Sequence, residues 1–246
     1  MDLFNKQLRD IEAYLAQKRQ EGKVSEFTGQ VRTNWPESKN RNLVLSQDTA
    51  VELGSPKDAS TSFLLWRNGR TGTNTGRITV VGPDLQQINA THVSFGKIVV
   101  VEGEGFHQGN SYERYRRLEQ VKYDVHLKGY MMRGVSQFQR EWSRVSKTAI
   151  RNGFSFRHLG SALMYKFLEL EFVRSVTVIF ITAGRSDVME METVADSVVQ
   201  IIGAMNKMAQ ELSFDCDACE FSDVCRDVAD LRSMRKKQTR KEAVNA

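Results

Sequence analysis

Cysteine is absent from almost all of this 246-residue chain. The sequence has three cysteines, and all of them lie between positions 216 and 225. This distribution does not resemble the disulfide framework of a small secreted domain. Three clustered cysteines could bind a metal. The alternative is an intramolecular disulfide between two of them, which would leave the third thiol unpaired.

Long apolar runs are also absent. No stretch approaches the roughly 18–20 apolar residues that a membrane-spanning helix needs. The first ten residues, MDLFNKQLRD, lack a basic region followed by an apolar stretch, so the sequence indicates no signal peptide. We therefore expect a cytoplasmic location. An apolar content of 40% and a charged content of 26% predict a soluble globular chain of one large or two small domains.

Common catalytic motifs are missing as well. The glycine-rich loop from Gly69 to Gly76 lacks the G-K-[ST] of a phosphate-binding loop, and strand-like residues follow it. We predict a hairpin-type connection there instead. The four histidines share no spacing that would join them in one site: His92, His107, His126 and His158. The catalytic residues, if any exist, are unknown from the sequence.

The three cysteines form the clearest chemical pattern in the chain. Cys216, Cys219 and Cys225 lie in the run FDCDACEFSDVC. A C-x2-C step places two thiolates on one tight turn, and a third cysteine shortly after can close over the same centre. We predict a [4Fe–4S] cluster with one open iron, and zinc is the alternative metal. Several groups could supply a fourth ligand: Asp215, Asp217, Asp223, a distant histidine, a water or a partner.

Positive charge is concentrated at the end of the chain. The formal net charge is +5, and residues 226–246 contain seven Lys or Arg against three Asp or Glu. The near-neutral remainder argues against a dedicated nucleic-acid-binding domain. We interpret the basic tail as solvated, and its alternative role is contact with an acidic partner or a nucleic acid.

The apolar periodicity predicts an α+β fold, with a mixed β-sheet covered by helices, a C-terminal Cys-rich turn and a basic helical tail. The run SVTVIFIT at 175–182 predicts a central strand that is covered on both faces. Helices are expected at 3–21, 138–151, from Ser155 to about 167, 188–212 and 226–237. Further strands are expected at 42–53, 63–66, 77–81 and 97–101. The helices on either side of Asn152-Gly153 would form an αα-hairpin.

We expect four segments. These are an N-terminal helix (1–28), an α+β domain (43–212), a three-cysteine metal or cluster motif (213–231) and a basic tail (232–246).

One long run resembles a known family. The run WSRVSKTAIRNGFSFRHLG, from Trp142 to Gly160, is similar to a stretch of the acetyl-CoA synthase (beta) subunit of the carbon monoxide dehydrogenase/acetyl-CoA synthase complex. The residues that match the family pattern are Trp142, Arg144, Ser146, Lys147, Ala149, Gly153, Leu159 and Gly160. Other segments continue the likeness in the right order: 52–57, 81–84, 166–167 and 176–182. The resemblance covers about residues 43–182.

In that family the region is a middle domain associated with coenzyme A binding through arginines and tryptophan. The resemblance therefore implies a coenzyme A or partner surface at Trp142, Arg144 and Lys147. Guanidinium and ammonium groups suit phosphates, and an indole offers a stacking face. The alternative is that Trp142 is a core anchor. Where the family has a further Trp-containing segment, this chain has Met132-Arg133-Gly134.

The family's nickel–iron–sulfur centre uses four cysteines for a cubane and a Cys-Gly-Cys run for nickel. Cys216 and Cys219 resemble the opening pair, but the fourth cysteine and the Cys-Gly-Cys run are absent. The resemblance implies an iron–sulfur protein of anaerobic one-carbon, corrinoid-linked acetyl-CoA metabolism that works with a protein partner and lacks full acetyl-CoA synthase activity alone. If it is an enzyme, it would be a component of a CO-methylating acyltransferase complex. The alternative is a non-catalytic adaptor, stabilised by zinc or a cluster, that binds a protein or nucleic acid.

Overall fold

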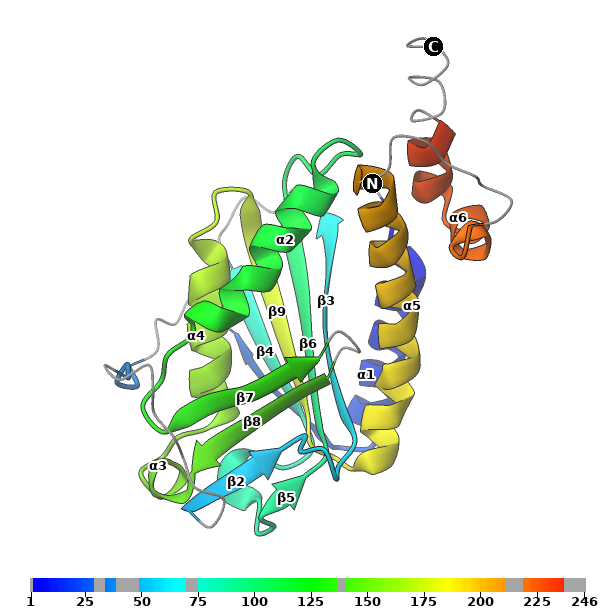
Figure 1. Cartoon of the computed structure of the whole chain (residues 1–246). Coiled ribbons are helices and arrows are strands. Elements are labelled where there is room, and N and C mark those ends of the chain that lie inside the picture. The colour runs from blue at the N-terminus through cyan, green and yellow to red at the C-terminus, as the bar shows by residue number, and fades with distance from the viewer. Residues whose placement is uncertain are drawn as a thin grey trace.

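A five-stranded mixed sheet forms the centre of the protein (Figure 1). The computed structural model describes residues 2–28, 34–38, 49–69, 75–136, 140–210 and 219–236. The strand order is β1 (Val24–Thr28), β4 (Thr75–Val81), β9 (Val173–Ile181), β6 (Phe95–Gly103) and β3 (Ser60–Asn68). Strands β4 and β9 are parallel, as are β6 and β3, whereas β1 with β4 and β9 with β6 are antiparallel pairs.

A smaller sheet of four strands lies across one face of the first (Figure 1). Its order is β5 (His92–Val93), β2 (Ala50–Leu53), β8 (Arg140–Ser146) and β7 (Tyr130–Ser136). Strand β8 runs antiparallel to both β2 and β7, and it also contacts β3 of the large sheet. The β8 strand therefore joins the two sheets.

Helices cover both faces of the large sheet. Helices α2 (Ser111–Val121) and α4 (Phe156–Leu168) pack together on one face (Figure 1). On the other face, α1 (Asn5–Gln20) contacts β1, and α5 (Arg185–Gln210) contacts β3 and β6. The short helices are η2 (Leu85–Gln87), η3 (Lys122–Asp124), α3 (Lys147–Arg151) and α6 (Ser222–Asp227), and residues 229–236 are also helical. The predicted α+β class is confirmed.

Strand β9 occupies the central position that its apolar run predicts. Its last four residues, 178–181, are all buried. On the α4 side, the ring of Phe180 lies 4.8 Å from that of Phe156 and 6.2 Å from that of Phe95. This stack fixes the first turn of α4 against the sheet. Ser155 stands at the N-cap of α4, as predicted.

The predicted helix at 138–151 is wrong over most of its length. Residues 140–146 form strand β8, and the helical part is the five-residue α3. The side chains of Glu141 and Ser143 point inward on alternate positions and are fully buried. These inward residues are polar, so the spacing of apolar residues does not indicate the two-residue period of a strand here. The expected αα-hairpin is therefore a strand, a short helical turn and α4.

The predicted hairpin after β3 is also wrong. The next strand along the chain is β4, but β6 and β9 lie between β3 and β4 in the sheet. Residues 70–74 of the connection lie outside the described part of the chain. The apolar residues 43–45, predicted as strand, also lie outside it. The helix expected at 226–237 is interrupted at Val228, and its Leu231 is buried.

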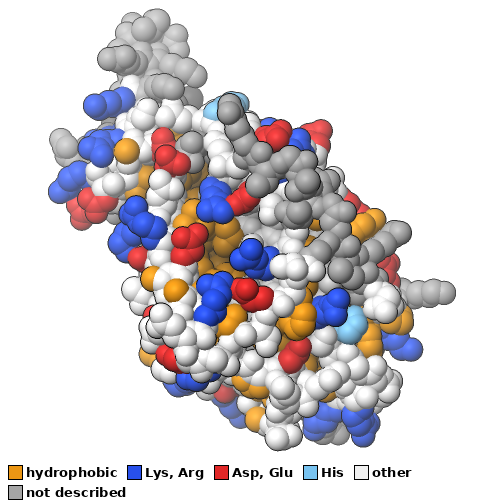
Figure 2. Space-filling view, turned by 180° about the vertical axis from the view of Figure 1, so that it is seen from behind, with side chains coloured by type: hydrophobic (Ala, Val, Ile, Leu, Met, Phe, Trp, Pro, Cys, Tyr) orange, Lys and Arg blue, Asp and Glu red, His pale blue; other side chains and the backbone are white. Residues whose placement is uncertain are grey.

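The molecular face seen from behind carries basic and acidic side chains interspersed around apolar ones (Figure 2). Described ion pairs include Arg19 with Glu26 and Arg67 with Glu102. This mixture agrees with a body of low net charge. Within the described residues, no helix is both long enough and apolar enough to span a membrane.

Candidate functional site

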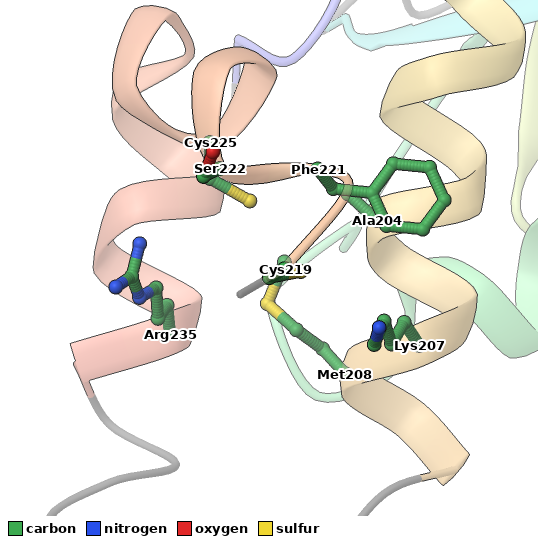
Figure 3. A pocket seen from close by; sticks show the side chains of 8 residues that line it. All are labelled: Ala204, Lys207, Met208, Cys219, Phe221, Ser222, Cys225 and Arg235. Atoms are coloured by element: carbon green, nitrogen blue, oxygen red, sulfur yellow. The ribbon is translucent and has the colours of Figure 1, made fainter. Parts of the chain in front are cut away.

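Two of the three cysteines lie at one hollow beside the C-terminal half of α5. Cys219 is half-buried and Cys225 is buried, with 6% of its surface exposed. Both are thiols and neither takes part in a disulfide. The two residues line the same hollow, into which Met208 also projects from α5 (Figure 3).

Local backbone bonds bring these two thiols together. The amide of Ser222 donates to the carbonyl oxygen of Cys219 across 3.0 Å, which closes a tight turn. The amide of Cys225 donates to the carbonyl of Phe221, also across 3.0 Å, in the first turn of α6. The tight turn that begins at Cys219 leads directly into α6. The thiol of Cys225 is therefore brought to the same side as the thiol of Cys219.

The hollow is lined mainly by apolar atoms, and two of its residues are basic. Its lining consists of Ala204, Lys207, Met208, Cys219, Phe221, Ser222, Cys225 and Arg235. Lys207 and Arg235 come from α5 and from the last described helical segment, so two positive side chains approach from different elements (Figure 3). The ammonium of Lys207 lies 3.8 Å from the carboxylate of Glu220, so its charge is already partly compensated. Two thiols and a thioether therefore line this hollow, which is two cysteines of the predicted set of three.

None of the other named candidate ligands is found in the hollow among the described residues. Cys216, Asp215 and Asp217 lie outside the described residues. Asp223 is on the exposed side of α6, where its carboxylate is 2.6 Å from the guanidinium of Arg226, so it does not line the hollow. In the described part of the chain no group of three or more His, Cys, Asp and Glu side chains could hold a metal. A complete site would therefore need residues such as Cys216 beyond that part.

A second locus surrounds Trp142 on β8. Trp142 and Arg144 alternate with the buried polar residues and so lie on the opposite face of the strand. The guanidinium of Arg144 contacts the carboxylate of Glu52, its cross-strand neighbour on β2, at 2.6 Å. The indole N–H of Trp142 donates to the other oxygen of that carboxylate. Glu52 thus holds both predicted side chains in a fixed arrangement.

The indole ring also lies against two cations. The guanidinium of Arg133 is 4.6 Å from the ring centroid of Trp142, and that of Arg144 is 5.6 Å away. Arg133 is exposed and Trp142 is half-buried. Lys147, the third predicted residue, is half-exposed at the start of α3, directly after β8. Trp142 is therefore a boundary residue, with its polar edge anchored and its ring in contact with an exposed arginine.

Sequence reasoning did not assign Glu52 or Arg133 to this locus. Glu52 belongs to a segment that resembles the family, but its role depends on the register between β2 and β8. Arg133 was noted as a departure from the family pattern. Its position over the indole could be inferred only from the pairing of β7 with β8, in which Gly134 lies opposite Trp142.

Replacing Glu52 with glutamine should lower the free energy of unfolding by about 2 kcal/mol. The neutral amide would remove the ion pair with the buried Arg144, although the hydrogen bonds could be partly kept. Urea unfolding followed by circular dichroism measures the loss. Exchange of Glu169 for glutamine is the control, because its pairing with Lys166 is solvent-exposed and should contribute under ~1 kcal/mol. Equal effects of the two variants would contradict the role of Glu52.

The inward face of β8 carries a buried charged network that the sequence did not predict. Glu141 is fully buried, and its carboxylate forms an ion pair with the ammonium of Lys97 on β6. The hydroxyls of Ser62, Ser143 and Tyr130 donate to the same carboxylate at 3.3, 3.1 and 3.4 Å. These contacts join Glu141 on β8 to β3 and β6 of the large sheet and to β7 of the small sheet.

The charges in this network shift its proton equilibria. Burial would raise the pKa of Glu141, but the Lys97 ammonium and the hydrogen bonds to Lys97 and Ser143 outweigh it and hold that pKa below its ordinary value. Burial, together with the Glu141 carboxylate, raises the pKa of Tyr130 well above its ordinary value. Glu141 is therefore ionised and Tyr130 neutral at pH 7, which makes the network a structural clamp between the sheets.

Comparison with known proteins identifies the family. The family model for the CO dehydrogenase/acetyl-CoA synthase complex beta subunit matches residues 39–188. No curated protein matches the chain. The matched region extends from before β2 to the start of α5 and includes the Trp142 locus, but it ends before the cysteines. More than half of the chain lies in the match, which confirms the resemblance: the chain belongs to the CO dehydrogenase/acetyl-CoA synthase complex beta subunit family.

Proposed function

We propose that this family member binds a [4Fe–4S] cluster through Cys216, Cys219 and Cys225 and works with a protein partner in anaerobic one-carbon, corrinoid-linked acetyl-CoA metabolism in the cytoplasm. In this proposal the α+β domain spans 43–212, the cluster motif spans 213–231 and a basic tail follows. A bound cluster of this type supplies one-electron transfer. The chain alone is not expected to perform full acetyl-CoA synthesis.

The observation that carries this proposal is the shared hollow of Cys219 and Cys225. Two thiols that are six positions apart face one space, and two cations line the same space. Soft thiolate donors favour iron–sulfur clusters and zinc over hard cations. With three cysteines in the whole sequence, a cubane would retain one iron that lacks a cysteine ligand. The family membership favours the iron–sulfur alternative over zinc.

Metal analysis of anaerobically purified protein tests the proposal. We expect about four irons and four sulfides per chain, with broad absorbance near ~400 nm, as a [4Fe–4S] protein should have. One zinc per chain without iron would overturn the cluster and support the alternative of a zinc-stabilised adaptor for a protein or nucleic-acid partner. Nickel together with iron would contradict the proposed absence of acetyl-CoA synthase chemistry.

We further propose that Trp142, Arg144 and Lys147 mark a coenzyme A or partner surface. The anchored indole offers a ring face, and Lys147 and the neighbouring Arg133 offer positive charge for phosphates. Arg144 is already paired with Glu52, so its role at this surface would be to orient the indole.

Coenzyme A binding should weaken about tenfold in a Lys147→Ala variant, because one charge-assisted phosphate contact of ordinary strength would be lost. Isothermal titration calorimetry at low salt measures the change. A Lys6→Ala variant is the control, because that lysine is exposed on α1 and pairs with Asp10, and it should bind as the unmodified chain does. An unchanged affinity for coenzyme A in Lys147→Ala would exclude this lysine from the surface. If the unmodified chain bound no detectable coenzyme A, a protein partner would be the remaining ligand of this surface.

A further inference from the structure

We infer that Gly203 and Phe221 form a lock that positions the cysteine-bearing turn on α5. Gly203 would then be a positioning residue for the metal site, and this part of the inference rests on the function proposed above. We use the word lock for the contact of the Phe221 ring with α5 at Gly203, a residue that has no side chain. Neither residue belongs to the family match, which ends at residue 188.

The first observation is a glycine in the middle of a long helix. Helix α5 has 26 residues, and Gly203 lies well inside it. Apart from proline, glycine is the least favourable residue in a helix interior, so a local reason for it is expected. A Cβ atom at this position would lie 2.9 Å from both Cε1 and Cζ of Phe221. Carbon atoms pack at about 3.5–4.0 Å, so any larger residue would displace the ring.

The second observation is the place of Phe221 in the turn. The residue lies between the two described cysteines, and its carbonyl accepts the hydrogen bond from the amide of Cys225. The tight turn from Cys219 to Ser222 ends next to it. Displacement of the ring would therefore remove the side-chain contact that attaches this turn, with its two thiols, to α5.

A third contact reinforces the same attachment. Lys207, one helical turn after Gly203, places its ammonium 6.0 Å from the centroid of the Phe221 ring. The same ammonium is 3.8 Å from the carboxylate of Glu220. In Figure 3 the ring of Phe221 lies against α5 near Ala204, while the sulfur of Cys225 points toward the hollow. Helix α5 thus holds the turn at two successive positions of one helical face.

The inference predicts that Gly203→Ala loosens the turn although alanine favours the helix. In metal-free, reduced protein, alkylation of Cys225 by iodoacetamide should become roughly tenfold faster, the change expected when a local contact of ordinary strength is lost. Peptide mass spectrometry assigns the rate to Cys225, which is buried in the unmodified chain. After anaerobic reconstitution, the same variant should also bind less iron.

Two further variants separate the lock from a general effect on α5. Thr193→Ala changes an exposed position of the same helix and, like Gly203→Ala, raises its helix propensity. This variant should leave the alkylation rate of Cys225 unchanged. In Gly203→Ala combined with Phe221→Leu, the smaller side chain relieves the contact, and the rate should return toward that of the unmodified chain. An unchanged rate in Gly203→Ala, or an equal increase in Thr193→Ala, would overturn the lock.

The outcomes also separate the lock from the proposed metal centre. The alkylation experiment contains no metal, so it tests the lock even if the unmodified chain binds no iron. Iron binding that is equal in Gly203→Ala and the unmodified chain, together with faster alkylation, would confirm the lock and contradict its positioning role for the metal site.

Discussion

Replacing Glu141 with glutamine should lower the free energy of unfolding by about 3–5 kcal/mol, the cost of breaking a buried ion pair by removing one partner. The Lys97 ammonium, buried in the same network, would then have no compensating charge. Chemical denaturation followed by circular dichroism measures this loss. It would be a large part of the roughly 5–15 kcal/mol that stabilises a typical domain.

Two controls identify the cause of that loss. Glu26→Gln removes a carboxylate from the more exposed pair with Arg19 and should cost under ~1 kcal/mol. The double variant Lys97→Met with Glu141→Gln removes both charges and should recover much of the stability lost in the single variant. A loss below ~1 kcal/mol in Glu141→Gln would show that the network does not clamp the sheets.

The same network should make stability depend on pH in the acid range. The folded-state pKa of Glu141 is below its ordinary value of 4.5. The group therefore stabilises the fold fully above the unfolded pKa, and this contribution is lost as the pH falls through the folded pKa. Unfolding midpoints measured from pH 7 down to pH 3 should fall less in Glu141→Gln than in the unmodified chain. Parallel pH profiles would contradict this assignment.

The second large effect should follow from Cys219→Ser. A serine hydroxyl is a much weaker ligand for iron than a thiolate, so the iron content after anaerobic purification should fall from about four atoms per chain to nearly zero. Met208→Leu is the matched control, because Met208 lines the same hollow and leucine conserves its volume. Full iron retention in Cys219→Ser would exclude this cysteine as a ligand, and loss in Met208→Leu would indicate that the thioether is one.

Much of the architecture could be predicted because its signals are local. The continuous apolar run of β9 indicated a central strand, and the long apolar stripe of α5 indicated a helix that ends just before the cysteines. Ser155 was identified as a helix cap from residue type and position. Such patterns are set by short stretches of sequence and need no knowledge of the partner elements.

The parts that failed depend on pairing between distant segments. Strand β8 resembles a helix because Glu141 and Ser143, which face inward, are polar and find their partners on β3, β6 and β7. The crossing from β3 to β4 could not be told from a hairpin, because strand order is a property of the whole sheet. The locus around Glu52 was incomplete for the same reason. The metal centre predicted from the cysteine spacing stays a prediction, because Cys216 lies outside the described residues.

Mössbauer spectroscopy of protein grown on 57Fe tests the central claim most directly. A [4Fe–4S] cluster held by three cysteines should show two kinds of iron in a ratio of roughly 3:1, because one iron has a different fourth ligand. The account predicts that ratio in the unmodified chain and loss of the spectrum in Cys219→Ser. A chain that takes up zinc and shows no iron spectrum after strictly anaerobic purification would contradict it.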